Sequence, residues 1–191
     1  MRIFKLSSKT NKMKIINTKF NGLKIIKGKT FYDKRGFLRE ILKNKLLNNK
    51  KFIFWIASKS KKNTIRGLHI QKKNSQAKFI CVLKGKIYDV ALDLRKKSKT
   101  YGKYFSTILS EKNSTSVYIP SGFAHGFCGL EKENLILYGM SNYRSKKNEI
   151  GISWKDNLLK IKWPKIRPII SLKDKKNKNL KSVLINSKNK N

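Results

Sequence analysis

The chain has 191 residues, which is the size of one ordinary domain and enough to bury a substantial core. Hydrophobic residues make up 39% of the chain and aromatic residues 10%, so the composition argues against wholesale disorder despite a formal net charge of +37. No apolar run approaches the roughly 20 residues that a membrane-spanning helix needs, and the basic start lacks an apolar run with a cleavage site, so neither a membrane segment nor export is expected.

The pattern predicts one β domain between two basic ends. Residues 1–12 are basic and polar, and Met13 is a second candidate start beside Met1. From residue 23 onward, short runs rich in Ile, Val, Phe and Tyr are separated by turn residues, which is typical of a sandwich or barrel. The runs are residues 23–26, 52–57, 79–83, 87–94, 105–109, 115–119, 123–130 and 135–140.

The segments between and after these runs give weaker structural signals. Gly85 and residues 120–122 predict turns, and residues 39–47 are a candidate short helix. Residues 175–191 are rich in Lys and Asn and predict a frayed tail. The folded domain is therefore expected to span residues 13–174.

The positive charge permits two interpretations. An excess of Lys and Arg favours a polyanionic partner through counterion release. However, Lys greatly outnumbers Arg, and Lys, Asn and Ile are abundant everywhere, as an AT-rich genome would produce at tolerant surface positions. The sequence contains no recognition helix, arginine-rich arm or alternation of aromatic and basic residues. We therefore do not expect nucleic acid as the main partner, although the charge would help to attract a small anionic substrate.

The two cysteines, Cys81 and Cys128, lie inside apolar, strand-like segments, and neither belongs to a pair with zinc-ligand spacing. They are expected to be reduced core residues of a cytoplasmic protein. The two histidines, His69 and His125, lie in segments that contain glycine. A lone histidine is more often structural than catalytic, but a polar side chain inside a β-barrel needs partners or a ligand. Strict alternation along a strand would put His69 on one face and Arg66 on the other, unless local twist turns one of them inward.

Short motifs follow one another along the chain, and their order is specific. They are Asp33-Lys34-Arg35-Gly36-Phe37 with Glu40, Arg66-Gly67-Leu68-His69 with Gln71, Gln76-Ala77-Lys78, residues 89–95, residues 118–127, Tyr138, Asn142-Tyr143, Glu149, Trp154-Lys155-Asp156, Trp163-Pro164 and residues 171–174. As a collinear set they resemble the dTDP-4-dehydrorhamnose 3,5-epimerase family. The resemblance implies an all-β, cupin-type jelly roll (double-stranded β-helix) with a few short helices.

The resemblance also implies a reaction. It inverts C3 and C5 of a nucleotide-linked 4-keto-6-deoxy hexose, turning dTDP-4-dehydro-6-deoxy-D-glucose into dTDP-4-dehydro-L-rhamnose through an enolate. By resemblance, His69 is the base and Asp174 its carboxylate partner. Lys78 would stabilise the enolate oxygen, and Tyr138 would be the acid on the opposite face. The implied setting is cytoplasmic synthesis of dTDP-L-rhamnose for surface polysaccharide such as lipopolysaccharide O-antigen.

The remaining implied site residues would bind the substrate. They are Arg35, Glu40, Arg66, His125, Glu149 and Lys173. The cationic members suit a diphosphate. No metal or other cofactor is expected, because His69 has no second histidine two residues on and His125 stands alone. The resemblance also implies a homodimer, with the N-terminal segment crossing to complete the partner's nucleotide site.

Composition gives some of these residues independent weight. Only 10 residues are acidic, so Asp174 inside a lysine-rich tail is unexpected, and the same holds for Glu40 and Glu149. Arg35 and Arg66 are arginines in a lysine-dominated chain, which suits bidentate contacts. Without the resemblance, Tyr138 would be an ordinary strand aromatic and Lys78 one lysine among many.

The chain departs from the family pattern at several positions. Phe54-Trp55-Ile56 stands where the family usually has a polar Gln-Asp-Asn-like stretch, Gly139-Met140 follows Tyr138, and Arg144 replaces what is often a second tyrosine. Two alternatives therefore stay open. One is an enzyme of the same fold that acts at C3 or C5 only, or on another nucleotide sugar. The other is a non-catalytic basic protein that binds sugar or nucleic acid.

Overall fold

The structure is a computed structural model that describes residues 12–185, so the expected basic extension lies outside it except for Lys12. The strands are β1 (Lys14–Asn17), β2 (Lys24–Lys27), β3 (Lys29–Asp33), β4 (Gly36–Glu40), β5 (Phe54–Lys61), β6 (Thr64–Gln71), β7 (Lys78–Lys84), β8 (Lys86–Asp93), β9 (Tyr104–Ser110), β10 (Thr115–Ile119), β11 (Phe123–Gly129), β12 (Glu133–Met140), β13 (Glu149–Gly151) and β14 (Ile169–Ile170). The helices are η1 (Asn44–Leu47), η2 (Lys146–Asn148), α1 (Leu172–Lys175) and α2 (Leu180–Ile185).

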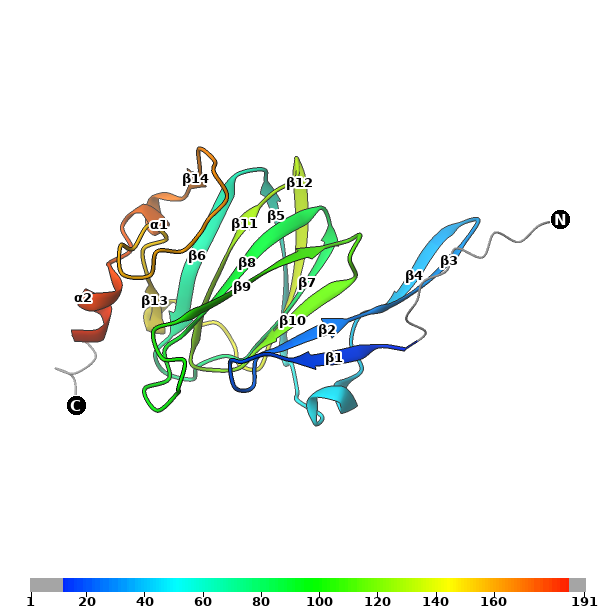
Figure 1. Cartoon of the computed structure of the whole chain (residues 1–191), viewed down its shortest axis with the longest axis horizontal. Coiled ribbons are helices and arrows are strands. Elements are labelled where there is room, and N and C mark those ends of the chain that lie inside the picture. The colour runs from blue at the N-terminus through cyan, green and yellow to red at the C-terminus, as the bar shows by residue number, and fades with distance from the viewer. Residues whose placement is uncertain (1–11, 186–191) are drawn as a thin grey trace.

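Two sheets make up the body of the domain (Figure 1). One has the strand order β1-β2-β10-β7-β12-β5, and the other has the order β13-β6-β11-β8-β9. Among the described strands, all pairings are antiparallel except that of β14 with β6. The predicted all-β jelly roll with a few short helices is confirmed.

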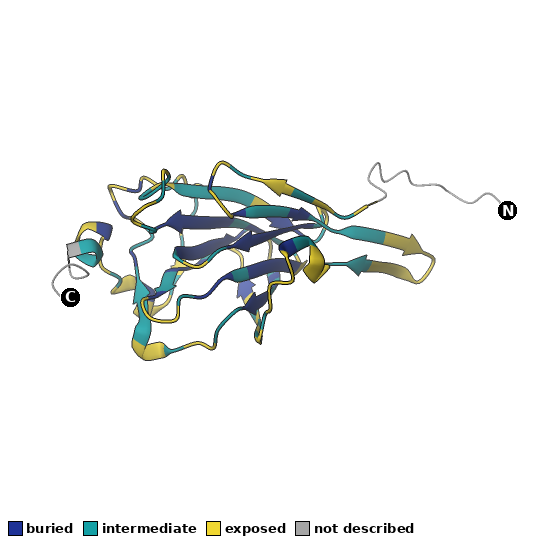
Figure 2. Ribbon diagram, turned by 90° about the horizontal axis from the view of Figure 1, so that it is seen from below, coloured by how far each residue is buried: buried dark blue, intermediate teal, exposed yellow. Residues whose placement is uncertain are grey.

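Apolar residues at alternate strand positions build the core between the sheets. In β5 the inward residues Phe54, Ile56 and Ser58 alternate with exposed neighbours, whereas β10 and β11 are buried throughout because both of their faces are covered. Figure 2 shows the buried strands in the middle of the domain and the exposed residues mainly in the surrounding loops. The largest side chains of this core include Phe20, Phe123 and other residues that are at most 2% exposed. Burying each such side chain contributes about 1.5–3 kcal/mol.

The C-terminal segment covers the outer side of the second sheet. Leu180 of α2 packs in a buried cluster with Leu68, Val90 and Ile152. Its amide donates a hydrogen bond of 2.6 Å to Asp156 Oδ2. The prediction of a frayed tail from residue 175 is therefore wrong as far as Ile185. The segment is too short to show a clear helical pattern in the sequence, but its few apolar residues cover an apolar face of the sheet.

The β3–β4 hairpin extends away from both sheets (Figure 1). Its apolar side chains remain exposed, including Tyr32 and Leu38, each with 65% of its surface accessible. Residues 39–47 contain less helix than predicted: Arg39 and Glu40 end β4, and only η1 is helical. No helix within residues 12–185 has the length and apolar character needed to cross a membrane.

Candidate active site

A cavity of about 580 Å³ opens between the two sheets. Strands β5, β6, β7, β11 and β12 contribute to its wall, together with β13, β14 and the start of α1. Eight of the ten predicted site residues line it: Arg66, His69, Lys78, His125, Tyr138, Glu149, Lys173 and Asp174. The fold thus brings together side chains that are spread over more than half of the sequence.

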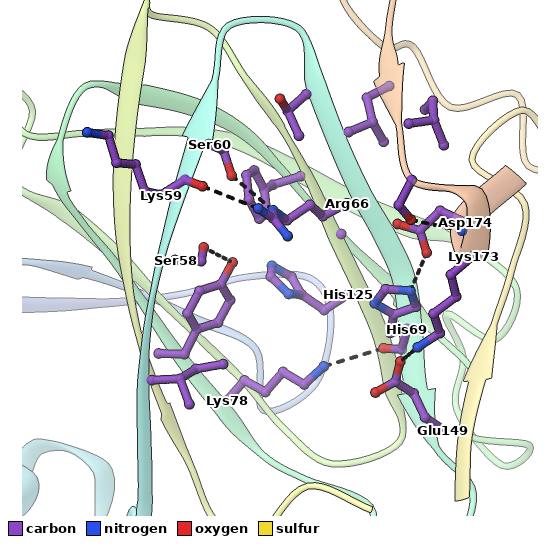
Figure 3. A pocket seen from close by; sticks show the side chains of 18 of the residues that line it. Ser58, Lys59, Ser60, Arg66, His69, Lys78, His125, Glu149, Lys173 and Asp174 are labelled. Carbon is purple, nitrogen blue, oxygen red and sulfur yellow. Dashed lines mark hydrogen bonds and ion pairs between the residues drawn. The ribbon is translucent and has the colours of Figure 1, made fainter. Parts of the chain in front are cut away.

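His69 and Asp174 form a hydrogen-bonded pair at one side of the cavity (Figure 3). His69 Nε2 lies 2.7 Å from Asp174 Oδ1. The carboxylate also accepts from the amide of Gly67 at 3.3 Å, while the Asp174 amide donates to Ser171 Oγ at 3.0 Å at the start of α1. Burial raises the pKa of Asp174, but hydrogen bonds from His69, Gly67 and Ser171 outweigh it and hold the pKa below its usual value. Asp174 is therefore ionised at neutral pH.

An irregularity in β6 turns two residues into the cavity. Strict alternation would direct Arg66 away from the face of His69, but both line the cavity. The register of β6 against β11 shifts between His125 and Phe127. Gly67 has a φ of +103°, and a Cβ there would lie 2.6 Å from the carbonyl oxygen of His125. Glycine thus permits the close approach of the two strands that reorients Arg66.

Lys78, the first residue of β7, is half-buried in the cavity, and its Nζ lies 3.4 Å from the carbonyl oxygen of His69. Burial lowers the pKa of Lys78 to about 8, against the pull of Glu149 and Asp89, whose negative charges raise it. At neutral pH the ammonium is mostly protonated yet poorly hydrated. Such a group interacts strongly with a nearby anion.

Tyr138 of β12 is 9% exposed, and its ring packs edge-to-face on His125 with centroids 6.2 Å apart. Its hydroxyl lies 3.4 Å from Ser58 Oγ. Burial raises the pKa of Tyr138, with a smaller contribution from the charge of Asp89. Tyr138 is therefore a neutral phenol that holds its proton at physiological pH.

A second histidine–carboxylate pair lies deeper in the molecule. His125 Nε2 is 2.7 Å from Asp89 Oδ2, and Asp89 is fully buried. Its other oxygen, Oδ1, has no hydrogen-bond partner within the described residues. Sequence reasoning placed Asp89 in a motif but gave it no role. The available signal was an acidic residue within an apolar strand of a chain that has few acids.

Three charged residues form a cluster at the edge of the cavity. Glu149 Oε2 accepts from Arg144 Nε at 2.8 Å, and Oε1 accepts from Lys173 Nζ. Burial raises the pKa of Glu149, but the hydrogen bonds of these two cations outweigh it and lower the pKa to about 2. Arg144, which the sequence marked only as a departure from the family pattern, is thus a cavity residue with a fixed partner.

The other two predicted residues lie on the projecting hairpin or at its base. Arg35 pairs with Asp33 at 2.7 Å and its side chain is 84% exposed, while Glu40 pairs with Lys43 at 3.0 Å. Neither lines the cavity of its own chain. Among residues 12–185, no group of three or more His, Cys, Asp or Glu side chains is arranged to hold a metal ion.

Comparisons with known proteins agree with the fold and the composition of the cavity. Residues 17–182 match the family model described as dTDP-4-dehydrorhamnose 3,5-epimerase. The chain is 39% identical over 168 residues to the dTDP-4-dehydrorhamnose 3,5-epimerase of Shigella flexneri, covering 85% of this chain and 93% of that protein.

Two crystal structures are also similar. The dTDP-4-dehydrorhamnose 3,5-epimerase of Bacillus anthracis, with TDP and PPi bound, has a TM-score of 0.84 and 39% identity over 88% of this chain and 100% of that one. The dTDP-6-deoxy-D-glucose-3,5-epimerase of Legionella pneumophila, in complex with dTDP-4-keto-L-rhamnose, has a TM-score of 0.85 and 38% identity over 89% of this chain and 94% of that one. The chain belongs to the dTDP-4-dehydrorhamnose 3,5-epimerase family and is an epimerase of the isomerase class.

Proposed function

We propose that this chain inverts C3 and C5 of dTDP-4-dehydro-6-deoxy-D-glucose and releases dTDP-4-dehydro-L-rhamnose. The observation that carries the proposal is the pairing of His69 with an ionised Asp174 in a cavity that also contains Lys78 and Tyr138. A base, a cation and a neutral acid are the groups that proton transfer next to a ketone requires. The cytoplasmic synthesis of activated L-rhamnose for surface polysaccharide is the setting that we propose for this reaction.

His69 acts as the base. Because Asp174 is an ionised acceptor, it holds the proton of neutral His69 on Nε2 and leaves the lone pair on Nδ1 free. Nδ1 takes the proton from the carbon next to the C4 ketone, and the electron pair of the broken C–H bond moves into the enolate. Asp174 then stabilises the imidazolium. Positioned proton transfer of this kind accelerates a reaction by typically about 10²- to 10⁴-fold.

Lys78 and Tyr138 complete the inversion. The ammonium of Lys78 stabilises the negative oxygen of the enolate, and losing one such preorganised donor commonly costs about 3 kcal/mol. Tyr138 then gives its proton to the same carbon from the opposite face. The imidazolium loses its proton to solvent and the phenolate regains one, so the site is reset for the second carbon.

The remaining polar residues would bind the nucleotide. Arg66 is held by Ser60 Oγ at 2.9 Å and by the carbonyl oxygen of Lys59 at 3.2 Å, which fixes its guanidinium in the wall of the cavity. Arg66, together with the edge residue Lys173, suits the negative charge of a diphosphate. His125, held by Asp89, would contact the same ligand.

We also propose a homodimer in which each β3–β4 hairpin reaches the cavity of the partner. Two observations support this arrangement. Arg35 lies far from the cavity of its own chain, and the hairpin exposes apolar side chains such as Tyr32 and Leu38 that a second copy would cover. In this arrangement Arg35 and Glu40 would contact the nucleotide bound by the partner.

The direct test is incubation with dTDP-4-dehydro-6-deoxy-D-glucose in D₂O, followed by NMR of the sugar. Deuterium at both C3 and C5, with formation of the L-rhamno product, is the expected result. Deuterium at one carbon would instead support an epimerase that acts at a single centre. This outcome is worth testing because Ile56 and Arg144, which depart from the family pattern, line the cavity. The proposed activity is overturned if the wild-type protein incorporates no more deuterium at C3 or C5 than the His69→Ala variant does.

A further inference from the structure

Ser58 is the hydrogen-bond partner of the proposed acid. It lies on β5 between two exposed residues, Ala57 and Lys59, so its side chain points into the cavity. Strand β5 pairs with β12, where Ile56 is opposite Tyr138 and Ser58 is opposite Ile136. The ring of Tyr138 therefore crosses diagonally to Ser58, and Figure 3 shows this serine on the opposite side of the cavity from His69.

The direction of this hydrogen bond matters for the chemistry. Ser58 Oγ donates to Tyr138 Oη at 3.4 Å, and within the described residues the phenol has no other hydrogen-bond partner. Because the phenol oxygen accepts this bond, its own O–H is free to point towards a substrate. A distance of 3.4 Å is long for two hydroxyl groups, but catalytic hydrogen bonds commonly shorten when the substrate or transition state is bound.

The phenol needs such a donor because of its surroundings. Giving up the proton leaves a phenolate in a buried site close to the carboxylate of Asp89, which raises the pKa of Tyr138 together with burial. Ser58 and the guanidinium of Arg66 act in the opposite direction. Ser60, two residues along on the same face, holds Arg66 at 2.9 Å. Neighbouring inward serines of β5 thus support two different groups of the site.

We propose that Ser58 is a positioning residue that orients the hydroxyl of Tyr138 and stabilises the phenolate left after proton delivery, and so favours inversion over return of a proton to the original face. This inference rests on the proposed epimerase activity. When delivery from Tyr138 slows, the enolate has more time to be reprotonated by His69. Since the proton on His69 exchanges with D₂O, that return gives deuterated substrate with unchanged configuration.

The test compares two rates in D₂O: deuterium incorporation into unreacted substrate and formation of inverted product. In Ser58→Ala we expect the ratio of the first rate to the second to rise about tenfold, a size that the loss of one hydrogen bond to a charged group can produce. Ser58→Thr retains a donor and fits a β-strand, so it should restore the ratio to near the wild-type value. Thermal unfolding identifies any loss of folding.

A matched control is Ser60→Ala, which removes the neighbouring hydroxyl that holds Arg66. It should raise KM for the nucleotide sugar and raise the ratio far less than Ser58→Ala does, because it removes a contact to Arg66 and none to the phenol. The inference is overturned if folded Ser58→Ala keeps the wild-type ratio, if Ser58→Thr raises it equally, or if Ser60→Ala raises it as much. A wild-type protein that neither exchanges nor inverts the sugar would instead overturn the proposed activity.

Discussion

His69 and Asp174 are 105 residues apart in the chain, yet Nε2 of the first lies 2.7 Å from Oδ1 of the second. The contact joins the middle of β6 to the short helix α1, which the Ser171 side chain caps. Because Gly67 also donates to Asp174, the same carboxylate fastens the C-terminal segment to β6 and orients the histidine. The geometry of the base therefore depends on how the end of the chain docks.

Asp174→Asn should remove most of the activity while retaining the fold. An amide can donate to His69 Nε2 and favour the wrong tautomer, so we expect kcat to fall by about 10²-fold or more and KM to change far less. Deuterium exchange at C3 and C5 should decrease together with kcat. Asp156→Asn is the control, because Asp156 lies outside the cavity and accepts hydrogen bonds from the backbone amides of Leu159 and Leu180. It should lower stability and reduce kcat far less than Asp174→Asn does, and wild-type exchange in Asp174→Asn would contradict the role of the pair.

Deprotonation of Lys78 should reduce the rate of the reaction at alkaline pH. Burial lowers its pKa to about 8, so the ammonium loses its proton, and with it the stabilisation of the enolate, as the pH rises through that value. The kcat/KM profile should therefore fall above about pH 8. Lys78→Arg, which stays charged, should lose this decrease even if its rate is lower. A profile that is flat to pH 10 in the wild-type enzyme would contradict the assignment.

The sequence predicted the central strands well, because most residues of runs such as 79–83 and 87–94 are buried between two covered faces and are therefore apolar. It did not predict β3 and β4, since that hairpin packs no apolar face against its own domain. Helix α2 was also missed, because its packing depends on an apolar sheet surface formed by distant residues.

For the site, pattern alone singled out the histidines and the rare acids. The positions of Tyr138 and Lys78 became meaningful only through the family resemblance. Alternation was wrong for Arg66 because a register shift between β6 and β11 depends on both strands together. Asp89 stayed without a role because nothing in the local sequence indicates that it faces His125.

Glu149 should make the protein sensitive to acid. Its pKa is lowered from an ordinary 4.5 to about 2, so its ionised form contributes stability above about pH 4.5 that is lost as the pH falls towards 2. Asp174 and Asp93, whose pKa values are also lowered, act in the same direction. Glu149→Gln should therefore flatten the decrease in unfolding free energy measured in urea between about pH 5 and 3.

Glu131→Gln is the control for this experiment. Glu131 also pairs with a lysine, Lys86, but it is exposed, and such surface pairs contribute little in salt. Its pH dependence of stability should match the wild type. If the two variants behave alike, the cluster of Glu149 with Arg144 and Lys173 has no special role in stability.

Mixing two inactive variants tests the exchange of hairpins between copies. If Arg35 serves the partner's cavity, a mixed dimer of Arg35→Ala and His69→Ala has one cavity with both defects and one with neither. After random exchange of subunits, about a quarter of the wild-type activity should return. Lys173→Ala mixed with His69→Ala is the matched control, since both residues line the cavity of their own chain and no intact cavity can form. Equal recovery in both mixtures, recovery in neither, or a monomeric mass in solution would rule out the exchanged hairpin.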